Sequence, residues 1–162
     1  MFEGLGKAVT HGGKNMEMIL VSDSHGNIDV LKEIVRRHPH ANYYLHLGDS
    51  ERCPNEIEPF VSVQGNCDPY DTYPKSRFFK TRYGTFYLEH GNGVGRSLDY
   101  MASKHADFYV YGHTHVQDIR TYQGMYILNP GSTTFPRDGS IGTYLVLSWD
   151  EKGELTIQPM KI

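Results

Sequence analysis

The chain has 162 residues, of which 38% are hydrophobic and 22% charged, so it can bury one core and is too apolar for wholesale disorder. Sixteen lysines and arginines against 19 aspartates and glutamates give a net charge of -3. That balance argues against duplex nucleic acid as a partner, which needs a basic stripe, and no apolar run approaches the roughly 18 residues of a membrane span.

The first 15 residues are polar and glycine-rich, with neither a helical nor a strand period. We expect a disordered leader, or a remnant of expression or of an over-long gene start, at residues 1–15 and a single domain at residues 16–162. The leader lacks the apolar stretch of a secretory signal. Cys53 and Cys67 have no CxxC spacing, so we expect reduced thiols in a cytoplasmic protein that does not bind membranes.

The first half of the domain predicts strands alternating with a helix. Short apolar runs typical of buried strands lie at Met18–Ser22, Tyr43–Leu47 and Phe60–Val63. Helical spacing separates the first two runs, at Ile28, Leu31, Ile34 and Val35. This helix is expected to end near His38-Pro39, because proline disfavours helical backbone in the residue before it.

The second half is richer in strands. Arg77–Arg82 and Thr85–Glu89 flank the turn Tyr83-Gly84 and predict a hairpin, and Leu98–His105 predicts a helix. Further short strands are predicted at Phe108–Tyr111, Asp118–Tyr122, Tyr126–Leu128, Thr143–Trp149 and Glu154–Gln158. The fold class is therefore α/β, and two stacked sheets with helices outside fit this order better than one fully parallel sheet.

Polar clusters with metal-ligand residue types follow the predicted strands. They are Asp23-Ser24-His25, Gly48-Asp49, Gly65-Asn66-Cys67-Asp68, His90-Gly91 and Gly112-His113-Thr114-His115. Open α/β sheets place their sites at the C-terminal ends of strands, and glycine beside each candidate permits close backbone approach. Each cluster alone is common by chance, so the prediction of a metal site depends on the ordered set.

The ordered set resembles the calcineurin-like metallophosphoesterases, whose pattern is D-x-H, G-D, G-N-H-[DE], H and G-H-x-H. The resemblance covers roughly residues 18–149. The small size, the stretches Ser22–Asn27 and Leu128–Ser132, and the G-N-C-D variant are similar to the compact phosphodiesterase branch without a cap. That branch includes a retromer subunit that kept the fold and largely lost the chemistry. The family implies a four-layer sandwich of two stacked mixed β-sheets flanked by helices.

Carried over position by position, the resemblance implies seven metal ligands. One ion is expected on Asp23, His25 and His115, a second on Asn66, His90 and His113, with Asp49 bridging both. Such oxygen and imidazole donors suit two divalent metal ions, with manganese our first expectation and nickel, iron or zinc as alternatives. The absence of thiolates from this set argues against a structural zinc site.

The implied reaction is phosphodiester hydrolysis by metal-activated hydroxide. Two divalent ions, two carboxylates and one hydroxide leave one net positive charge, which matches a small phosphodiester anion. The alternatives are a phosphomonoesterase that acts on a small phosphorylated metabolite with Arg137 as an extra cation, and a protein-binding scaffold with little catalytic activity. A homo-oligomer is compatible with either function.

Three further positions bear on the site. Cys67 stands where the larger family has a histidine that helps to protonate the leaving group, and a thiol donates a proton poorly. We keep Cys67 as the catalytic candidate and expect it to favour good leaving groups; a filler role beneath the site is the alternative. Asn92 stands where relatives often have a second histidine, and His46 is expected to pack behind the ligands.

Overall fold

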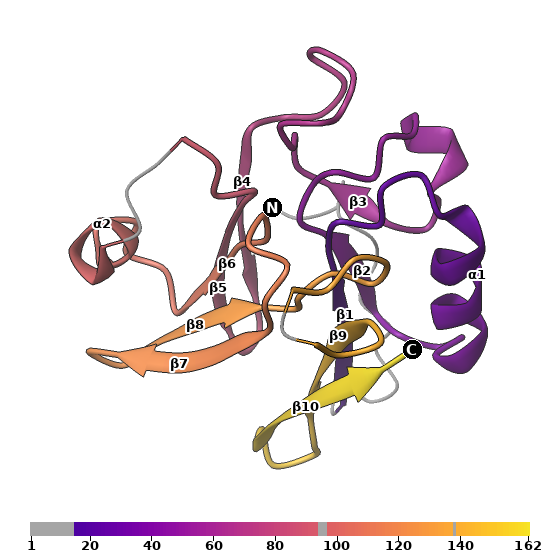
Figure 1. Ribbon diagram of the computed structural model, residues 1–162. Coiled ribbons are helices and arrows are strands. Elements are labelled where there is room, and N and C mark those ends of the chain that lie inside the picture. The colour runs from indigo at the N-terminus through magenta and orange to yellow at the C-terminus, as the bar shows by residue number, and fades with distance from the viewer. Residues whose placement is uncertain (1–14, 94–96, 138) are drawn as a thin grey trace.

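The computed structural model describes residues 15–93, 97–137 and 139–162, which form two stacked five-stranded sheets (Figure 1). The predicted leader at residues 1–15 lies outside the described residues except for Asn15. Among the described residues, no helix is both long and apolar enough to cross a membrane.

The first sheet has the strand order β10 (Leu155–Lys161), β9 (Thr143–Trp149), β1 (Met16–Val21), β2 (Tyr43–His46) and β3 (Val61–Ser62). Strands β1, β2 and β3 are parallel, and β9 pairs antiparallel with both β1 and β10. Helix α1 (Ile28–Arg37) connects β1 to β2 and begins after Asn27, whose side chain accepts from the Val30 N–H at 3.1 Å.

The second sheet has the strand order β4 (Ser76–Thr81), β5 (Gly84–Glu89), β6 (Phe108–Val110), β8 (Met125–Asn129) and β7 (Asp118–Tyr122). Strands β5, β6 and β8 are parallel, while β4 and β7 form antiparallel edges. The short helix α2 (Leu98–Ala102) lies between β5 and β6 in the chain.

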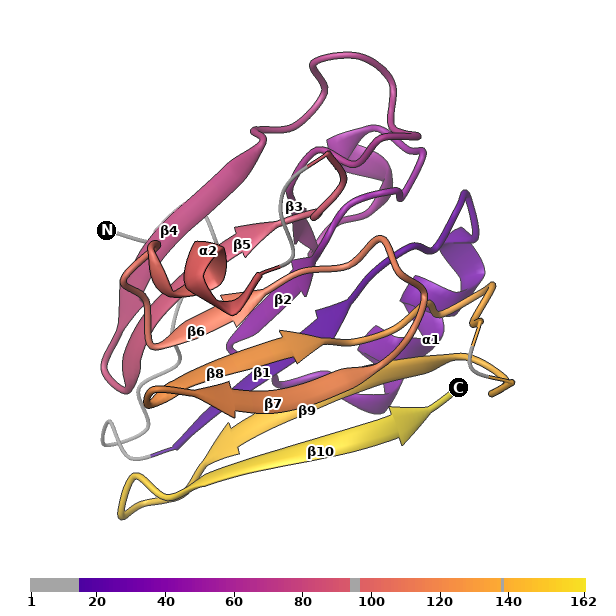
Figure 2. The same ribbon diagram turned by 60° about the vertical axis from the view of Figure 1, so that its left-hand side comes forward.

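Three apolar clusters hold four layers together (Figures 1 and 2). The cluster between the sheets draws on strands of both and includes the stacked rings of Phe86 and Phe108, with centroids 4.2 Å apart. The outer face of the first sheet packs against Leu31 and Ile34 of α1, and that of the second against Met101 of α2. The prediction of two stacked mixed sheets flanked by helices is confirmed.

The element boundaries differ from the prediction by more than one residue at three places. Strand β1 begins at Met16 rather than Met18, because Met16 already packs in the core between the sheets. Helix α2 ends at Ala102 instead of reaching His105. Strand β10 runs to Lys161 through Pro159, which an edge strand tolerates because one side of it pairs with no strand in the described part of the chain. A one-turn helix, η2 (Pro54–Glu56), was not predicted.

Candidate metal centre

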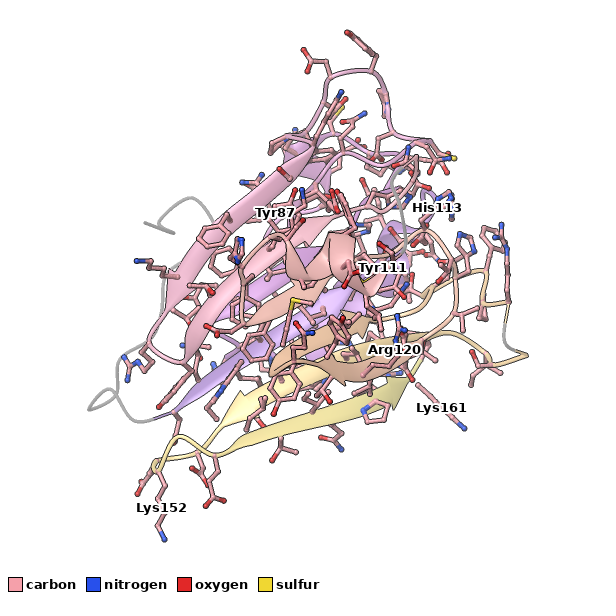
Figure 3. All side chains as sticks on the ribbon, turned by 90° about the vertical axis from the view of Figure 1, so that its left-hand side faces the viewer. Tyr87, Tyr111, His113, Arg120, Lys152 and Lys161 are labelled. Carbon is pink, nitrogen blue, oxygen red and sulfur yellow. The ribbon has the colours of Figure 1, made fainter. Side chains whose placement is uncertain are left out.

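The loops that follow the parallel strands of both sheets meet at one end of the sandwich. Backbone bonds tie them together: the Asp23 N–H donates to Gly48 O at 3.0 Å, and the His25 N–H to Asp49 O at 2.9 Å. The His113 N–H crosses between sheets to Asp23 Oδ2 at 3.0 Å. Figure 3 shows His113 at this end, far from Lys152 at the other.

The backbone of these loops is strained at the candidate ligands. Five of the seven have φ between 46° and 70°, in the left-handed region: Asp23, His25, Asp49, His113 and His115. Non-glycine residues rarely adopt this conformation, and it persists where surrounding contacts enforce it, often at functional sites. The strain turns these side chains toward a common point that regular strand geometry would not reach.

Two glycines let the loops approach closely. A Cβ on Gly65 would lie 2.1 Å from Asp49 Oδ1, and a Cβ on Gly112 would lie 2.1 Å from Ser22 Oγ. No side chain fits at either position. The glycines beside the predicted ligands therefore serve the close packing of the site.

Asp23, His25 and His115 form a first group, whose ligand atoms lie within 4.8 Å of one another. The His25 Nδ1–H donates to the Glu51 carboxylate at 2.5 Å, and the His115 Nδ1–H donates to Phe135 O at 2.6 Å. Because these partners only accept, both neutral rings keep a lone pair on Nε2. The two Nε2 atoms lie 3.2 Å apart, and His115 Nε2 lies 3.2 Å from Asp23 Oδ1.

A second group lies around His90. Its Nδ1–H donates to Leu47 O at 2.6 Å, so Nε2 faces Asn66 Oδ1 at 2.9 Å and Asp49 Oδ2 at 3.2 Å. His113 Nδ1 lies 3.1 Å from the same Asn66 oxygen. The structure thus brings all seven predicted ligands into two adjoining groups, and Asp23 Oδ1 lies near both, 3.9 Å from His90 Nε2.

The electrostatics of these groups suit cations. Asp23 Oδ1 is buried and has no hydrogen-bond partner among the described residues, a costly state for a carboxylate oxygen. Burial raises the pKa of Asp49, but the hydrogen bond and charge of His90 and the Cys67 N–H outweigh it and hold the pKa at about 2. Burial lowers the pKa of His90, yet the Asp49 and Asp23 carboxylates raise it overall. The donor set therefore fits divalent ions.

Cys67 lies exposed at the rim of the site and does not fill space beneath it. Its N–H donates to Asp49 Oδ1 at 2.8 Å, and its thiol accepts from the Asn66 amide at 3.5 Å. Burial of part of the side chain, followed by the charges of Asp49 and Glu51, raises the pKa of the thiol.

His46 packs behind the ligands, as predicted. Its ring is fully buried, accepts from the Gly48 N–H at Nδ1 (3.1 Å) and donates from Nε2 to Ser24 Oγ (2.8 Å). Burial, together with the charge of His90, lowers the pKa of His46 to about 3. The ring is therefore neutral at physiological pH and braces two ligand loops.

Two carboxylates important to the site were missed from the sequence. Glu51 orients the His25 ring, and Asp68 accepts three backbone N–H bonds, from Asp49 (2.9 Å), Glu51 (2.7 Å) and Gly65 (2.8 Å). Asp68 was expected only as a member of the cluster Gly65-Asn66-Cys67-Asp68, with no role of its own. Its position three residues after Gly65 could have indicated that its carboxylate accepts from the backbone of the loop.

A cleft of about 620 Å³ opens beside the first group. It is lined by His25, Glu51, His115, Phe135, Pro136 and Arg137. The cleft thus places the predicted ligands within reach of a small molecule.

Comparison with known proteins gives consistent matches over most of the chain. Residues 16–152 match the model of the calcineurin-like phosphoesterase superfamily domain. The probable metallophosphoesterase YsnB of Bacillus subtilis is 31% identical over 143 residues, which cover 82% of this chain and 84% of that protein. Phosphodiesterase YfcE of Escherichia coli is 23% identical, and the match covers 91% of this chain and 95% of that protein.

Among solved structures, Vacuolar Protein Sorting 29 from Cryptosporidium parvum superimposes with a TM-score of 0.70. It shares 17% sequence identity, and the match covers 92% of this chain and 98% of that one. A likeness at this identity shows a common fold.

Proposed function

Since the chain belongs to the calcineurin-like phosphoesterase superfamily and is a metal-dependent phosphoesterase, we propose that its substrates are small phosphodiesters and that its centre holds two divalent ions. The observation that carries this proposal is the convergence of three ligand atoms. Asp23 Oδ1, which is buried without a hydrogen-bond partner among the described residues, faces His115 Nε2 at 3.2 Å, and His115 Nε2 lies 3.2 Å from His25 Nε2.

In the proposed assignment, Asp23, His25 and His115 hold one ion. Asn66, His90 and His113 hold the second, and Asp49 bridges the two. Bound divalent ions supply Lewis-acid activation of water and of phosphoryl oxygens. The carbonyls of Leu47 and Phe135 and the Glu51 carboxylate accept from Nδ1 of three ligand rings, which leaves Nε2 of each ring as the nitrogen that would bind an ion.

Charge favours a diester over a monoester. The two carboxylates in the donor set, Asp23 and Asp49, offset half of the charge of two divalent ions, and a nucleophilic hydroxide offsets one more. The remaining single positive charge matches a phosphodiester monoanion. The relative YfcE is named a phosphodiesterase, which supports the same reading for this chain.

Oxygen and imidazole donors without a thiolate suit manganese, with nickel, iron and zinc as alternatives. The net charge of -3 disfavours duplex nucleic acid as a substrate. A cytoplasmic location agrees with two free cysteines.

Cys67 is the proposed catalytic side chain besides the ligands. Its thiol lies at the rim of the site, in a group with His25 and Glu51, and replaces the imidazole that would protonate a leaving group. The enzyme is accordingly proposed to favour phosphodiesters whose leaving group departs without strong acid assistance, such as aryl alcohols.

The test compares metal-stripped protein refilled with manganese, nickel, zinc or magnesium on matched aryl phosphodiester and monoester substrates. We expect metal-dependent turnover with a preference for the diester, reduced about a hundredfold or more in Asp49→Asn. Asp29→Asn, an exposed aspartate in the first turn of α1, is the matched control and should retain turnover. Stoichiometric metal binding without turnover by any ion would instead indicate a scaffold that kept its ions, and monoester preference would indicate a phosphomonoesterase.

A further inference from the structure

The cleft beside the candidate metal centre exposes a large apolar ring. Phe135 is 57% exposed, and its ring lies 5.8 Å from the His25 ring, centroid to centroid. The His25 ring in turn lies 5.1 Å from that of His115. Three rings therefore run in a row from the rim of the cleft to the Nε2 atoms of the predicted ligands.

The backbone that carries Phe135 is fixed to the metal centre on both sides. The Phe135 carbonyl accepts from His115 Nδ1 at 2.6 Å, and the Phe135 N–H donates to Ser132 Oγ at 2.8 Å. Ser132 Oγ donates to Asp23 O at 2.8 Å, and the Arg137 N–H donates to His115 O at 3.0 Å. The backbone of Phe135 is thus held by the same contacts that orient the ligands.

Covering a water-exposed apolar ring with a flat apolar group lowers the free energy. The position of Phe135 indicates which group would cover it. Only the His25 ring separates Phe135 from the atoms that face the predicted ions, so a substituent esterified to a phosphate at those ions would extend over Phe135. Aromatic and heterocyclic groups stack on such a ring because each offers a π-face.

The charges in the cleft limit the substituent further. Glu51 and Arg137 both line it. A carboxylate beside His25 repels a second anionic group at that position, so the substituent is expected to carry no further phosphate there. Arg137 adds one positive charge to the same lining.

We propose that Phe135 is a stacking platform that makes the enzyme selective for phosphodiesters bearing a planar aromatic or heterocyclic group. This inference rests on the proposed phosphodiesterase function and names the substrate class of the same site. Phe135 acts on binding and selectivity through its ring, while its carbonyl, which orients His115, is retained in any substitution of the side chain.

The experiment measures dissociation constants by titration calorimetry on the manganese-loaded protein. Two probes carry one negative charge, as a diester does: the monomethyl esters of phenylphosphonic and methylphosphonic acid. The wild-type protein is expected to bind the phenyl probe about tenfold more tightly than the methyl probe. Phe135→Ala should bring this ratio close to one, and Phe135→Leu, which keeps apolar bulk without a π-face, should recover only part of it.

Phe78→Ala is the matched control, because Phe78 is also an exposed phenylalanine, at 51%, but lies on β4 outside the cleft lining. It should leave the ratio unchanged. A wild-type ratio near one, an unchanged ratio in Phe135→Ala, or a full ratio in Phe135→Leu overturns the stacking proposal alone. If neither probe binds and no diester is hydrolysed in an Asp49-dependent manner, the proposed function fails as well.

Discussion

The Glu51 carboxylate accepts a hydrogen bond from His25 Nδ1–H at 2.5 Å, across 26 residues of sequence. Glu51 has a φ of 57°, and its N–H donates to the Asp68 carboxylate, which holds the loop in place. The contact fixes which nitrogen of His25 carries the proton and turns Nε2 toward Asp23, at 3.7 Å from its Oδ1. Glu51 is therefore a positioning residue for a predicted ligand.

Replacing Glu51 should weaken metal binding without unfolding the protein. For Glu51→Ala we expect a loss of metal affinity on the order of 10–100-fold, because the His25 ring loses its orienting acceptor. Glu51→Gln should lose less, since the amide oxygen can still accept. Titration with manganese measures the affinity, and Glu151→Ala, in an exposed turn, is the control. Equal affinity in Glu51→Ala and wild type would contradict the positioning role.

Removing the Asp68 carboxylate should destabilise the fold itself. Three backbone N–H groups donate to it, and Asp68→Ala leaves them without that acceptor beside the ligand loops. We expect a loss of about 3 kcal/mol in the free energy of unfolding, measured by urea denaturation of the metal-free protein. The loss for Asp68→Asn should be smaller than for Asp68→Ala, because the amide oxygen of asparagine can still accept a hydrogen bond. A loss below 1 kcal/mol in Asp68→Ala would show that water replaces the carboxylate there.

Cys67→His should change the dependence of rate on the leaving group. An imidazole at this position can donate a proton that the thiol gives up poorly, so the rate should rise most for poor leaving groups. The slope of log kcat/KM against leaving-group pKa, measured for a series of diesters, should become shallower. An equal change across the series would contradict an acid role at this position. Metal content measured in both proteins controls for altered loading.

His46 should make the stability of the metal-free protein depend on pH. Its pKa is about 3 when folded and 6.5 as a model value, so the folded state resists protonation. The contribution is fully present above pH 6.5 and is lost as the pH falls from there toward 3. Between pH 7.5 and 5 the loss amounts to about 2 kcal/mol.

Urea midpoints at the two pH values test this contribution. The free energy of unfolding of His46→Gln should lie about 2 kcal/mol closer to that of the wild type at pH 5 than at pH 7.5, since glutamine has no proton to gain. His40→Gln, at an exposed histidine, serves as the control and should keep the wild-type profile. A constant difference between His46→Gln and wild type at both pH values would show that the ring is protonated in the folded protein.

The sequence predicted the strands and the ligand clusters well because both have local signatures. Apolar runs mark buried strands such as β2, and a polar cluster after each run marks the loop that follows. The convergence of Asp23 with His115 could be inferred only from the ordered set, since no local pattern joins residues so far apart. The order of the predicted strands and helices favoured two stacked sheets, and the family resemblance added the four-layer sandwich.

The missed features lack such signatures. Glu51 is one carboxylate among many, and its role depends on a left-handed backbone that no motif announces. Helix η2 has Cys53 as its N-cap, which is not a usual capping residue, although Glu56 accepts from the Cys53 N–H at 2.9 Å. Just after helix α2, the Ser103 hydroxyl donates to the Tyr100 carbonyl and His105 has a φ of 54°, and a hydrophobic pattern reveals neither.

The candidate ligands come from both sheets: Asp23, His25, Asp49 and Asn66 follow strands of the first, and His90, His113 and His115 follow strands of the second. Ions shared among them would crosslink the two halves of the sandwich, and an unfolded chain cannot hold residues 90 positions apart around one ion. Metal binding would then add to the global stability of the folded state. In a cell, chains made when the metal is scarce would be degraded sooner, so the abundance of this protein would follow the metal supply.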